Sequence, residues 1–561
     1  MPVPQMPQSS DPSRGVAYQP SDEVDFVVVG AGAAGGVMAR ELSQAGFRVV
    51  VLEQGPWLTS TDFKHDEMWV NYLSGLTNDY EQSPNTLRAT EQAVAKVTPA
   101  VKYGRVVGGG SVHFTANYWR FHPIDFIERS KRGPIAGSSF DDWPITYEEL
   151  EPYYTKVDWD IGVSGVAGAN PFDPPRSRPY PMPPLPIKSS GVLFERGATK
   201  LGWHPAPAPM AIASVPYRGG GACAHCGFCE TFGCEMGAKS STLVRMIPDA
   251  VATGRCEIRP LSYVRKIETN SAGRVTGVKY FDSRRREIFQ RAKAVVLSAN
   301  GAESPRLLLM SAATRFRHGL ANSSGIVGRN VMFNGDAFGG ALFEHEVNGY
   351  KGAVVSRIVH DFYELDEKTG AIGGGGIDFR HDLTPISFAF VGLGRDAPKW
   401  GSDYKRLLRQ WYTRSVYALA HTTQLPVPTN SVSLDPDARD KWGLPAIRVT
   451  FTQHPNDAKV VQFFHERVRE LLVASGSVSQ WMAKAEPSFP QVHLLGTCRM
   501  GNDPRTSVVD KYHRAHDVPN LFIVDGSNFV TSGRGQPTMT IQALAFRAAE
   551  HIAAFAKRGE I

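Results

Sequence analysis

The chain has 561 residues, enough for several domains of about 150 residues or for one large α/β enzyme unit with a sizeable core. Its 61 Lys and Arg residues against 55 Asp and Glu residues leave a formal net charge of +6, with no run of five or more like charges, which argues against nucleic acid as a partner. The composition, 42% hydrophobic and 21% charged, is that of a globular protein, and no stretch approaches the ~18 consecutive apolar residues of a membrane span.

Residues 1–23 are predicted to form a flexible arm. The segment is rich in proline and has neither an apolar core segment nor a twin arginine. We therefore expect a loose arm that carries no export signal of its own.

The first strong element is a βαβ unit. Residues 24–29 predict a buried parallel strand, residues 33–45 a helix and residues 47–52 a second strand. The turn between the first strand and the helix reads GAGAAG. The glycines of its GxGxxG pattern are Gly30, Gly32 and Gly35. Glu53 follows where a carboxylate accepts hydrogen bonds from a ribose hydroxyl, so the context favours dinucleotide binding over a structural turn.

The remaining elements predict a second architecture inserted into the first. The proline-rich residues 171–186 should form an extended surface connector, and 294–298 a later strand of the parallel sheet, followed by a helix. Between 336 and 489 the pattern predicts antiparallel strands at 377–380, 386–393 and 447–451, and helices at about 401–416 and 457–474. The tail returns to α/β, with a strand at 521–526 and a helix at 538–555.

Several segments resemble the glucose–methanol–choline (GMC) oxidoreductases, in family order and from residue 24 onward. They are HLLGTCRM at 493–500, NLFIVDGS at 520–527, GQPTMTI at 535–541, GGGS at 108–111 and VVLSANGAESPRLLL at 295–309. The cysteine-rich segment at 223–234 and residues 430–445 look most like the iron–sulfur-containing catalytic subunits of bacterial gluconate, glucose, fructose and glucoside 3-dehydrogenases. The resemblance implies an FAD enzyme that oxidises a C–OH group.

The resemblance also implies the domain organisation. We expect an α/β fold whose Rossmann-like FAD-binding domain comprises residues 24–115, 216–335 and 490–561. The inserted α+β substrate-binding domain, an antiparallel sheet with helices, and its connector comprise 116–215 and 336–489.

Candidate flavin contacts follow from the glycine turn and from the resemblance. They are Gly30, Gly32, Gly35, Glu53, Gly109, Ser111, His113, Asn117, Asp525 and Thr538. NAD could use the same turn, but the chain has no second GxGxxG for a nicotinamide. In some relatives a histidine placed like His113 is joined covalently to the flavin; noncovalent packing against the ring is the alternative.

Oxidation of a carbinol requires a base at the hydroxyl as the hydride leaves, and imidazole suits this role near neutral pH. His493 matches the active-site histidine of the family. The family usually has His or Asn where this chain has Gln536, which can still offer both a donor and an acceptor. Cys498 stands where some relatives have a second histidine, and we expect it to be a packing residue.

The remaining motif is CAHCGFCETFGC, with Cys223, Cys226, Cys229 and Cys234 within twelve residues. Its short intervals favour an iron–sulfur cluster, with zinc or plain reduced thiols as alternatives. The resemblance implies a [3Fe–4S] centre, which needs three of the four thiolates.

The expected function is FAD-dependent oxidation of a sugar or glycoside hydroxyl, with electrons passing through the cluster to an external acceptor. The alternatives are an oxidase that makes hydrogen peroxide and keeps the cysteines structural, and a subunit whose flavin only relays electrons. The resemblance further implies a small partner subunit with the export signal, a cytochrome c acceptor and a periplasmic location; a cytoplasmic enzyme acting alone is the competing expectation.

Overall fold

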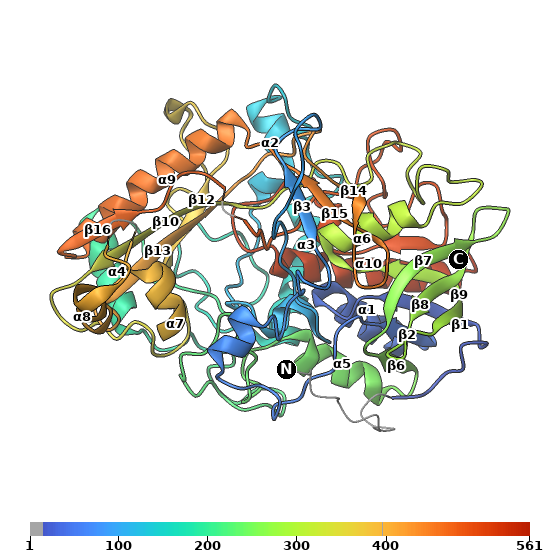
Figure 1. The fold of residues 1–561 in the computed structure, drawn as a ribbon, viewed down its shortest axis with the longest axis horizontal. Helices are drawn as coiled ribbons and strands as arrows, with labels where there is room; N and C mark the ends of the chain where they lie inside the picture. Colours follow the sequence, from blue (N-terminus) through green and yellow to red (C-terminus); the bar gives the residue numbers. More distant parts are fainter. Residues whose placement is uncertain (1–14, 395–396, 488) are drawn as a thin grey trace.

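The computed structural model describes residues 15–394, 397–487 and 489–561. Two large sheets lie at opposite ends of the molecule (Figure 1). One is a seven-stranded sheet with a parallel core, and the other is a six-stranded antiparallel sheet. The described part therefore has the predicted α/β fold with an inserted antiparallel region.

The core of the seven-stranded sheet is formed by five parallel strands. In order they are β6 (Cys256–Arg259), β2 (Val49–Leu52), β1 (Val24–Val29), β9 (Glu287–Leu297) and β17 (Leu521–Ile523). The first half of β9 pairs instead with β8 (Val275–Phe281), which in turn pairs with β7 (Tyr263–Thr269). The β-branched run of β1 lies between β2 and β9, where it is buried on both faces.

Helices cover this sheet and link it to the rest of the chain. Helix α1 (Ala33–Gln44) packs against α5 (Thr242–Ala252) and α10 (Thr538–Lys557), and α10 also contacts α3 (Tyr147–Val157). Further helices are α2 (Pro123–Arg132), α6 (Asn300–Met310) and α8 (Gly401–Trp411). Within the described ranges, no helix combines the length and the apolar character needed to cross a membrane.

The six-stranded sheet has two chemically different faces. Its strands are, in order, β16 (Ser479–Met482), β10 (Gly335–Leu342), β13 (Ser415–Thr422), β12 (Gly375–Arg380), β11 (Arg357–Val359) and β5 (Ala206–Pro207). Alternate residues such as Phe379 and Ala418 form a core with α9 (Pro455–Ala474) and α4 (Ser189–Lys200). The residues between them, including Arg380 and Leu419, face the centre of the molecule.

A third sheet was not expected from the sequence. It joins β14 (Ser431–Arg439), β15 (Pro445–Thr450), β3 (Asn85–Arg88) and β4 (Lys96–Val97). The predicted strand at 447–451 is present as β15, but it pairs with β14 and, in parallel, with β3. Helix α6 packs on β14, so this sheet borders the parallel one.

The predicted strand at 386–393 is wrong. This stretch is helical, with α7 (Pro385–Ser387) followed by a π-helical turn at Phe388–Gly392. Proline at the first helical position favours this start. The Glu67 carboxylate accepts hydrogen bonds from the backbone N–H groups of Ile386 and Ser387, at 2.9 and 2.5 Å. A residue more than 300 positions away thus caps the helix, and periodicity cannot reveal such a contact.

The predicted arm at 1–23 lies partly outside the described residues. Its described part, 15–23, is not loose, because Tyr18 donates its backbone N–H to the Glu257 carboxylate at 2.8 Å and Gly15 bridges to the same residue. By contrast, 171–186 has no helix or strand and is largely exposed, as predicted for a connector.

Candidate active site

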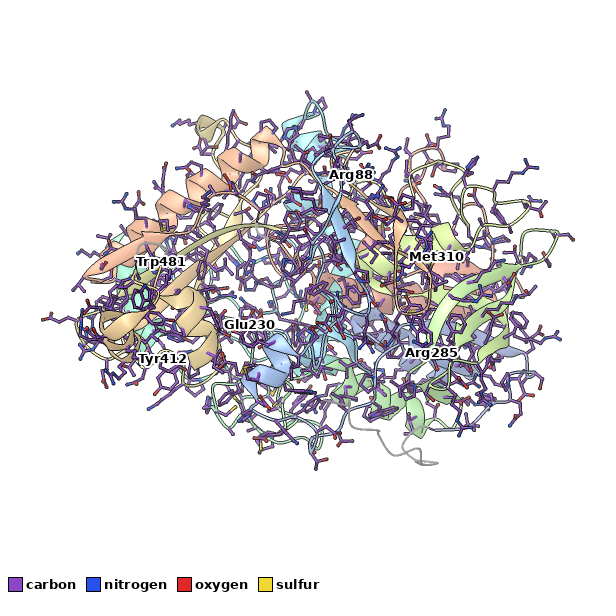
Figure 2. The ribbon with its side chains drawn as sticks, viewed as in Figure 1. Arg88, Glu230, Arg285, Met310, Tyr412 and Trp481 are labelled. Atoms are coloured by element: carbon purple, nitrogen blue, oxygen red, sulfur yellow. The ribbon has the colours of Figure 1, made fainter. Side chains whose placement is uncertain are left out.

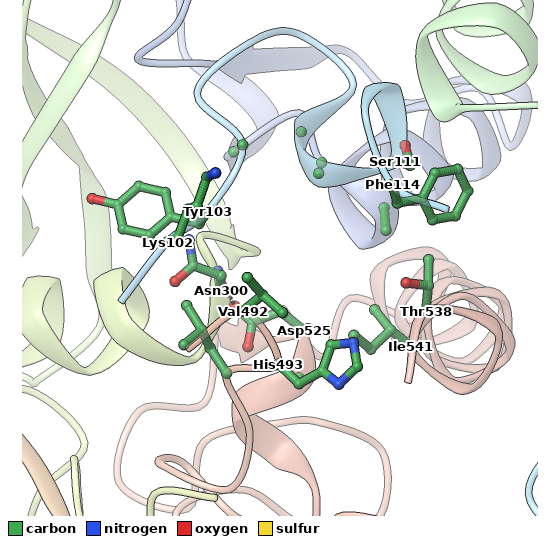
Figure 3. A pocket seen from close by; sticks show the side chains of 18 of the residues that line it. Lys102, Tyr103, Ser111, Phe114, Asn300, Val492, His493, Asp525, Thr538 and Ile541 are labelled. Atoms are coloured by element: carbon green, nitrogen blue, oxygen red, sulfur yellow. Dashed lines mark hydrogen bonds between the residues drawn. The ribbon is translucent and has the colours of Figure 1, made fainter. Parts of the chain in front are cut away.

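A cavity of about 490 Å³ lies between the carboxyl ends of β1 and β2 and the inner face of the six-stranded sheet. Figure 3 shows part of its lining, including Ser111, His493 and Asp525. This volume is typical of a small-molecule or cofactor site. Most predicted site residues line it: Gly30, Gly32, Glu53, Gly109, Ser111, His113, His493, Asp525, Gln536 and Thr538. Gly35 and Asn117 are not part of the lining.

The glycine turn depends on close backbone contacts. Gly30 has φ +96°, and a Cβ there would lie 2.4 Å from the Ser298 carbonyl oxygen. Gly109, at φ +57°, approaches Gly32 so closely that its Cβ would lie 2.7 Å from the Gly32 Cα. Gly35 acts from outside the cavity, because a Cβ there would meet the Gly30 carbonyl oxygen at 1.9 Å. The turn therefore leaves backbone and a helix N-terminus open to the cavity, as a pyrophosphate requires.

Two buried carboxylates border the cavity. Glu53 accepts hydrogen bonds from the backbone N–H groups of Ala31 and Gly55, at 3.0 and 2.8 Å. Asp525 accepts from the Ser304 hydroxyl at 2.5 Å and from backbone N–H groups. Burial raises the pKa of both carboxyls, and these hydrogen bonds oppose the shift. Both side chains are thus held firmly at the cavity wall.

Some polar atoms at the cavity have no hydrogen-bond partner among the described residues. They are Nε2 of His113, Oγ of Ser298 and both amide atoms of Gln536. Burial and the nearby Lys239 lower the pKa of His113 to about 3, so this imidazole is neutral. Buried polar groups without partners indicate a missing ligand. Together with the glycine turn, they fit the FAD that the resemblance implies.

His493 reaches the cavity from the segment that precedes β17 (Figure 3). Its Nδ1 lies 2.7 Å from Oδ1 of Asn334. Burial lowers the pKa of His493 to about 4, and the neighbouring His421 contributes to the shift. His493 is therefore a neutral imidazole at physiological pH and is able to accept a proton.

Sequence reasoning missed the polar residues that the six-stranded sheet contributes. Asp336 on β10, Arg380 on β12 and His421 on β13 line the cavity. The ring centroids of His421 and His493 are 5.9 Å apart. The period-2 pattern of β12 and β13 indicates which side chains share a face, but not which face borders the cavity.

Asn117 contacts this face of the sheet without lining the cavity. It donates a hydrogen bond to Asp378 at 3.2 Å, and Asp378 binds Arg380 through two hydrogen bonds of 2.8 and 2.7 Å. Asn117 thus supports a residue that lines the cavity instead of bordering the cavity itself.

All four clustered cysteines border one small cavity of about 20 Å³. Cys229 is buried, Cys226 is exposed, and none of them forms a disulfide. Burial raises the pKa of Cys229 to about 11, and the neighbouring thiols contribute. Across the part of the chain that the structure describes, no three His, Cys, Asp or Glu side chains are arranged to hold a single metal ion.

The cysteine segment also borders the large cavity. Glu230 and Thr231 follow Cys229 directly and line that cavity. Figure 2 shows Glu230 in the middle of the molecule, between the region of Trp481 and the region of Met310. Burial and the neighbouring Asp382 raise the pKa of Glu230 to about 8.

Comparison with known proteins agrees with this geometry. The N-terminal and C-terminal family models of the GMC oxidoreductases match residues 24–334 and 426–545. The chain is 36% identical to 2-methyl-1,2-propanediol dehydrogenase of Mycolicibacterium austroafricanum, covering 95% of each chain. It is 31% identical to the fructose dehydrogenase large subunit of Gluconobacter japonicus, covering 95% of this chain and 98% of the relative.

A solved structure with a similar fold is pyridoxine 4-oxidase from Mesorbium loti. The TM-score is 0.63 at 19% identity, with coverage of 94% of this chain and 98% of the other. Both family models and the relatives agree with the cavity and its glycine turn. The chain therefore belongs to the GMC oxidoreductase family and is an FAD-dependent oxidoreductase acting on CH–OH groups.

Proposed function

We propose that this chain oxidises a hydroxyl of a sugar or glycoside to a ketone or lactone, with His493 as the base and an external electron acceptor. The observation that carries the proposal is a half-buried, neutral imidazole at the wall of the cavity beside the glycine turn. A base is needed there because the hydroxyl proton must leave as the carbinol carbon loses its hydride.

His493 takes the hydroxyl proton in this scheme, and the carbonyl forms as the hydride leaves the same carbon. The unpartnered amide of Gln536 orients the substrate oxygen, since it offers both a donor and an acceptor. When bound, FAD supplies the hydride acceptor. Residues of the glycine turn would hold its pyrophosphate, and the start of α10 at Thr538 offers the positive end of a helix dipole.

The polar inner face of the six-stranded sheet supports the proposed substrate class. Asp336, Arg380 and His421 make this part of the cavity wall polar, which suits a compound with several hydroxyls. Two relatives are named for a diol and for fructose. A screen of glucose, gluconate, fructose, sorbitol, alkyl and aryl glucosides and 2-methyl-1,2-propanediol with an artificial dye acceptor tests this assignment. Absence of turnover with the whole panel would reject it.

We further propose a [3Fe–4S] iron–sulfur centre held by three of the four thiolates of Cys223, Cys226, Cys229 and Cys234. Four thiols around one cavity support it, as does the short path through Glu230 and Thr231 to the large cavity. Protein isolated without air should contain about three iron atoms per chain, because that centre holds three. Background iron with stoichiometric hydrogen peroxide under air would favour an oxidase with structural cysteines.

The proposed electron path needs a partner. The fructose dehydrogenase relative is named a large subunit, which supports a hetero-oligomer. We propose a small subunit with the export signal, a cytochrome c acceptor and a periplasmic location. Fractionation of the host with co-purification tests this; a lone cytoplasmic monomer active without any companion would contradict it.

A further inference from the structure

Asn334 contacts His493 through its side chain, and the backbones of the two segments are paired two residues away. Met332 and Leu495 exchange two backbone hydrogen bonds of 3.0 Å in antiparallel register. Two residues further along each segment, Asn334 lies opposite His493. Asn334 is only 4% exposed and directly precedes β10. The pair is therefore held in place by paired main chain and not by flexible side chains.

The hydrogen bonds of Asn334 fix which way its amide points. Its Nδ2 donates to the Thr422 carbonyl oxygen at 3.2 Å. A backbone carbonyl only accepts, so the NH₂ group must face Thr422 and Oδ1 must face His493. The backbone carbonyl of Thr422 thus determines that Oδ1 is the amide atom of Asn334 that faces the imidazole.

This orientation determines the tautomer of His493. Oδ1 of Asn334 only accepts, so the imidazole nitrogen 2.7 Å away, Nδ1, must carry the hydrogen. A neutral imidazole has one N–H group, and the lone pair is therefore on Nε2.

His421 has the same tautomer, but its Nε2 is occupied. Arg380 lies 3.3 Å from this nitrogen, and a guanidinium only donates, so Nε2 of His421 must accept. Its Nδ1 lies 3.2 Å from Asp336. Of these two neighbouring imidazoles, His493 is the one whose Nε2 is left for a substrate hydroxyl.

We propose that Asn334 is a positioning residue that holds His493 in the Nδ1–H form, so that Nε2 is the basic nitrogen. The inference rests on the proposed function, in which His493 is the base. It assigns a role to a residue that lines the cavity but belongs to no motif in the sequence.

Asn334→Asp is the decisive variant, with Asn430→Asp as its matched control. Both asparagines are buried and donate Nδ2 to a backbone carbonyl, of Thr422 and Thr452 respectively. Asn430 does not line the cavity. A carboxylate at 334 stabilises the imidazolium, so the acid limb of kcat/KM should move up by about 1 to 3 pH units. The control should leave the limb in place, even if it lowers stability.

Asn334→Ala should lower kcat/KM by at least ~10-fold with the flavin still bound. The loss should not exceed the ~10²–10⁴-fold that the general base itself contributes. All rates use the alcohol from the screening panel that turns over, with the dye acceptor. An unshifted acid limb in a folded, flavin-loaded Asn334→Asp enzyme would overturn the proposal.

A measurement independent of turnover keeps the test open if these variants fail to fold. In wild-type protein labelled with ¹⁵N-histidine, the signals of His493, identified by their loss in His493→Gln, should show a protonated Nδ1 and an unprotonated Nε2. The reverse pattern would overturn the positioning role alone. A His493→Gln enzyme at wild-type rate would instead reject the proposed base.

Discussion

Thr231 donates its backbone N–H to the carbonyl oxygen of His113 at 2.7 Å, so the cysteine segment is hydrogen-bonded directly to the loop that lines the FAD-sized cavity. Lys239 strengthens this connection with three further hydrogen bonds. Its buried ammonium donates to the carbonyl oxygens of Cys229, Phe232 and Phe114 at 2.5, 2.7 and 3.2 Å. A group bound by the thiols would thus be connected, through these hydrogen bonds, to the backbone that lines the large cavity.

Lys239→Met should therefore loosen the cysteine segment. Three carbonyl groups lose their donor, and a buried unpaired group costs about 1–3 kcal/mol, so we expect the free energy of unfolding to fall by roughly 3 kcal/mol or more. Urea titration measures this change, and iron content should fall with it. Lys188→Met is the control, because Lys188 also donates to backbone carbonyls, at Ala353 and Val354. Equal iron loss in both variants would contradict the specific role of Lys239.

His493→Ala should lower kcat by about 10²–10⁴-fold while the flavin stays bound, because the variant lacks the proton acceptor. Steady-state rates and the flavin absorbance of the purified variant check both parts. A rate near that of the wild type would show that another group accepts the proton.

Gln536→Ala should cost less than His493→Ala. The amide of Gln536 offers hydrogen bonds to the substrate oxygen but takes no proton. Steady-state kinetics of the two variants, measured side by side, decide the order. A larger loss at Gln536 would shift the main catalytic role to the head of α10.

The protein should lose stability as the pH falls below about 6.5. Burial lowers the pKa of five histidines to about 3 or 4: His113, His360, His381, His493 and His513. In the unfolded chain these groups titrate near 6.5. Between that pH and 4 the unfolded chain binds more protons, so the free energy of unfolding falls as pH falls. Urea titrations from pH 7.5 to 4.5 measure the slope, and His360→Gln should reduce it; an unchanged slope would contradict the assignment.

Acid precipitation should release the flavin to the supernatant, because we expect His113 to pack against the ring without a covalent bond. His113 lines the cavity, and its buried Nε2 has no hydrogen-bond partner among the described residues. His113→Ala should then weaken flavin binding, measured by flavin retained after dialysis. Yellow colour that stays with the wild-type pellet and is lost in the variant would instead establish a bond at this residue.

The sequence predicted the parts of the fold whose signals are local. The apolar run of β1, the glycine turn and the helix after it are contiguous, so the βαβ unit at 24–52 was predicted correctly. The helix at 386–392 was missed because its cap comes from Glu67, far away in the chain.

The same distinction applies to the site. His493 and the glycines belong to motifs, whereas Asn334 acquires its role only through pairing with a segment 159 residues away. Arg380 and His421 belong to strands with no recognisable motif, and only the packing of α9 on one face of their sheet turns them toward the cavity.

Side chains along β12 and β13 point alternately to the cavity and to the hydrophobic core, so substitutions on one face leave the other face unchanged. Substitutions at 380, 419 and 421 alter the lining of the cavity, while their neighbours 379, 418 and 420 remain packed under α4 and α9. New substrates can therefore be accommodated by changing every second residue of these strands, and the hydrophobic core that keeps the sheet folded is inherited unchanged.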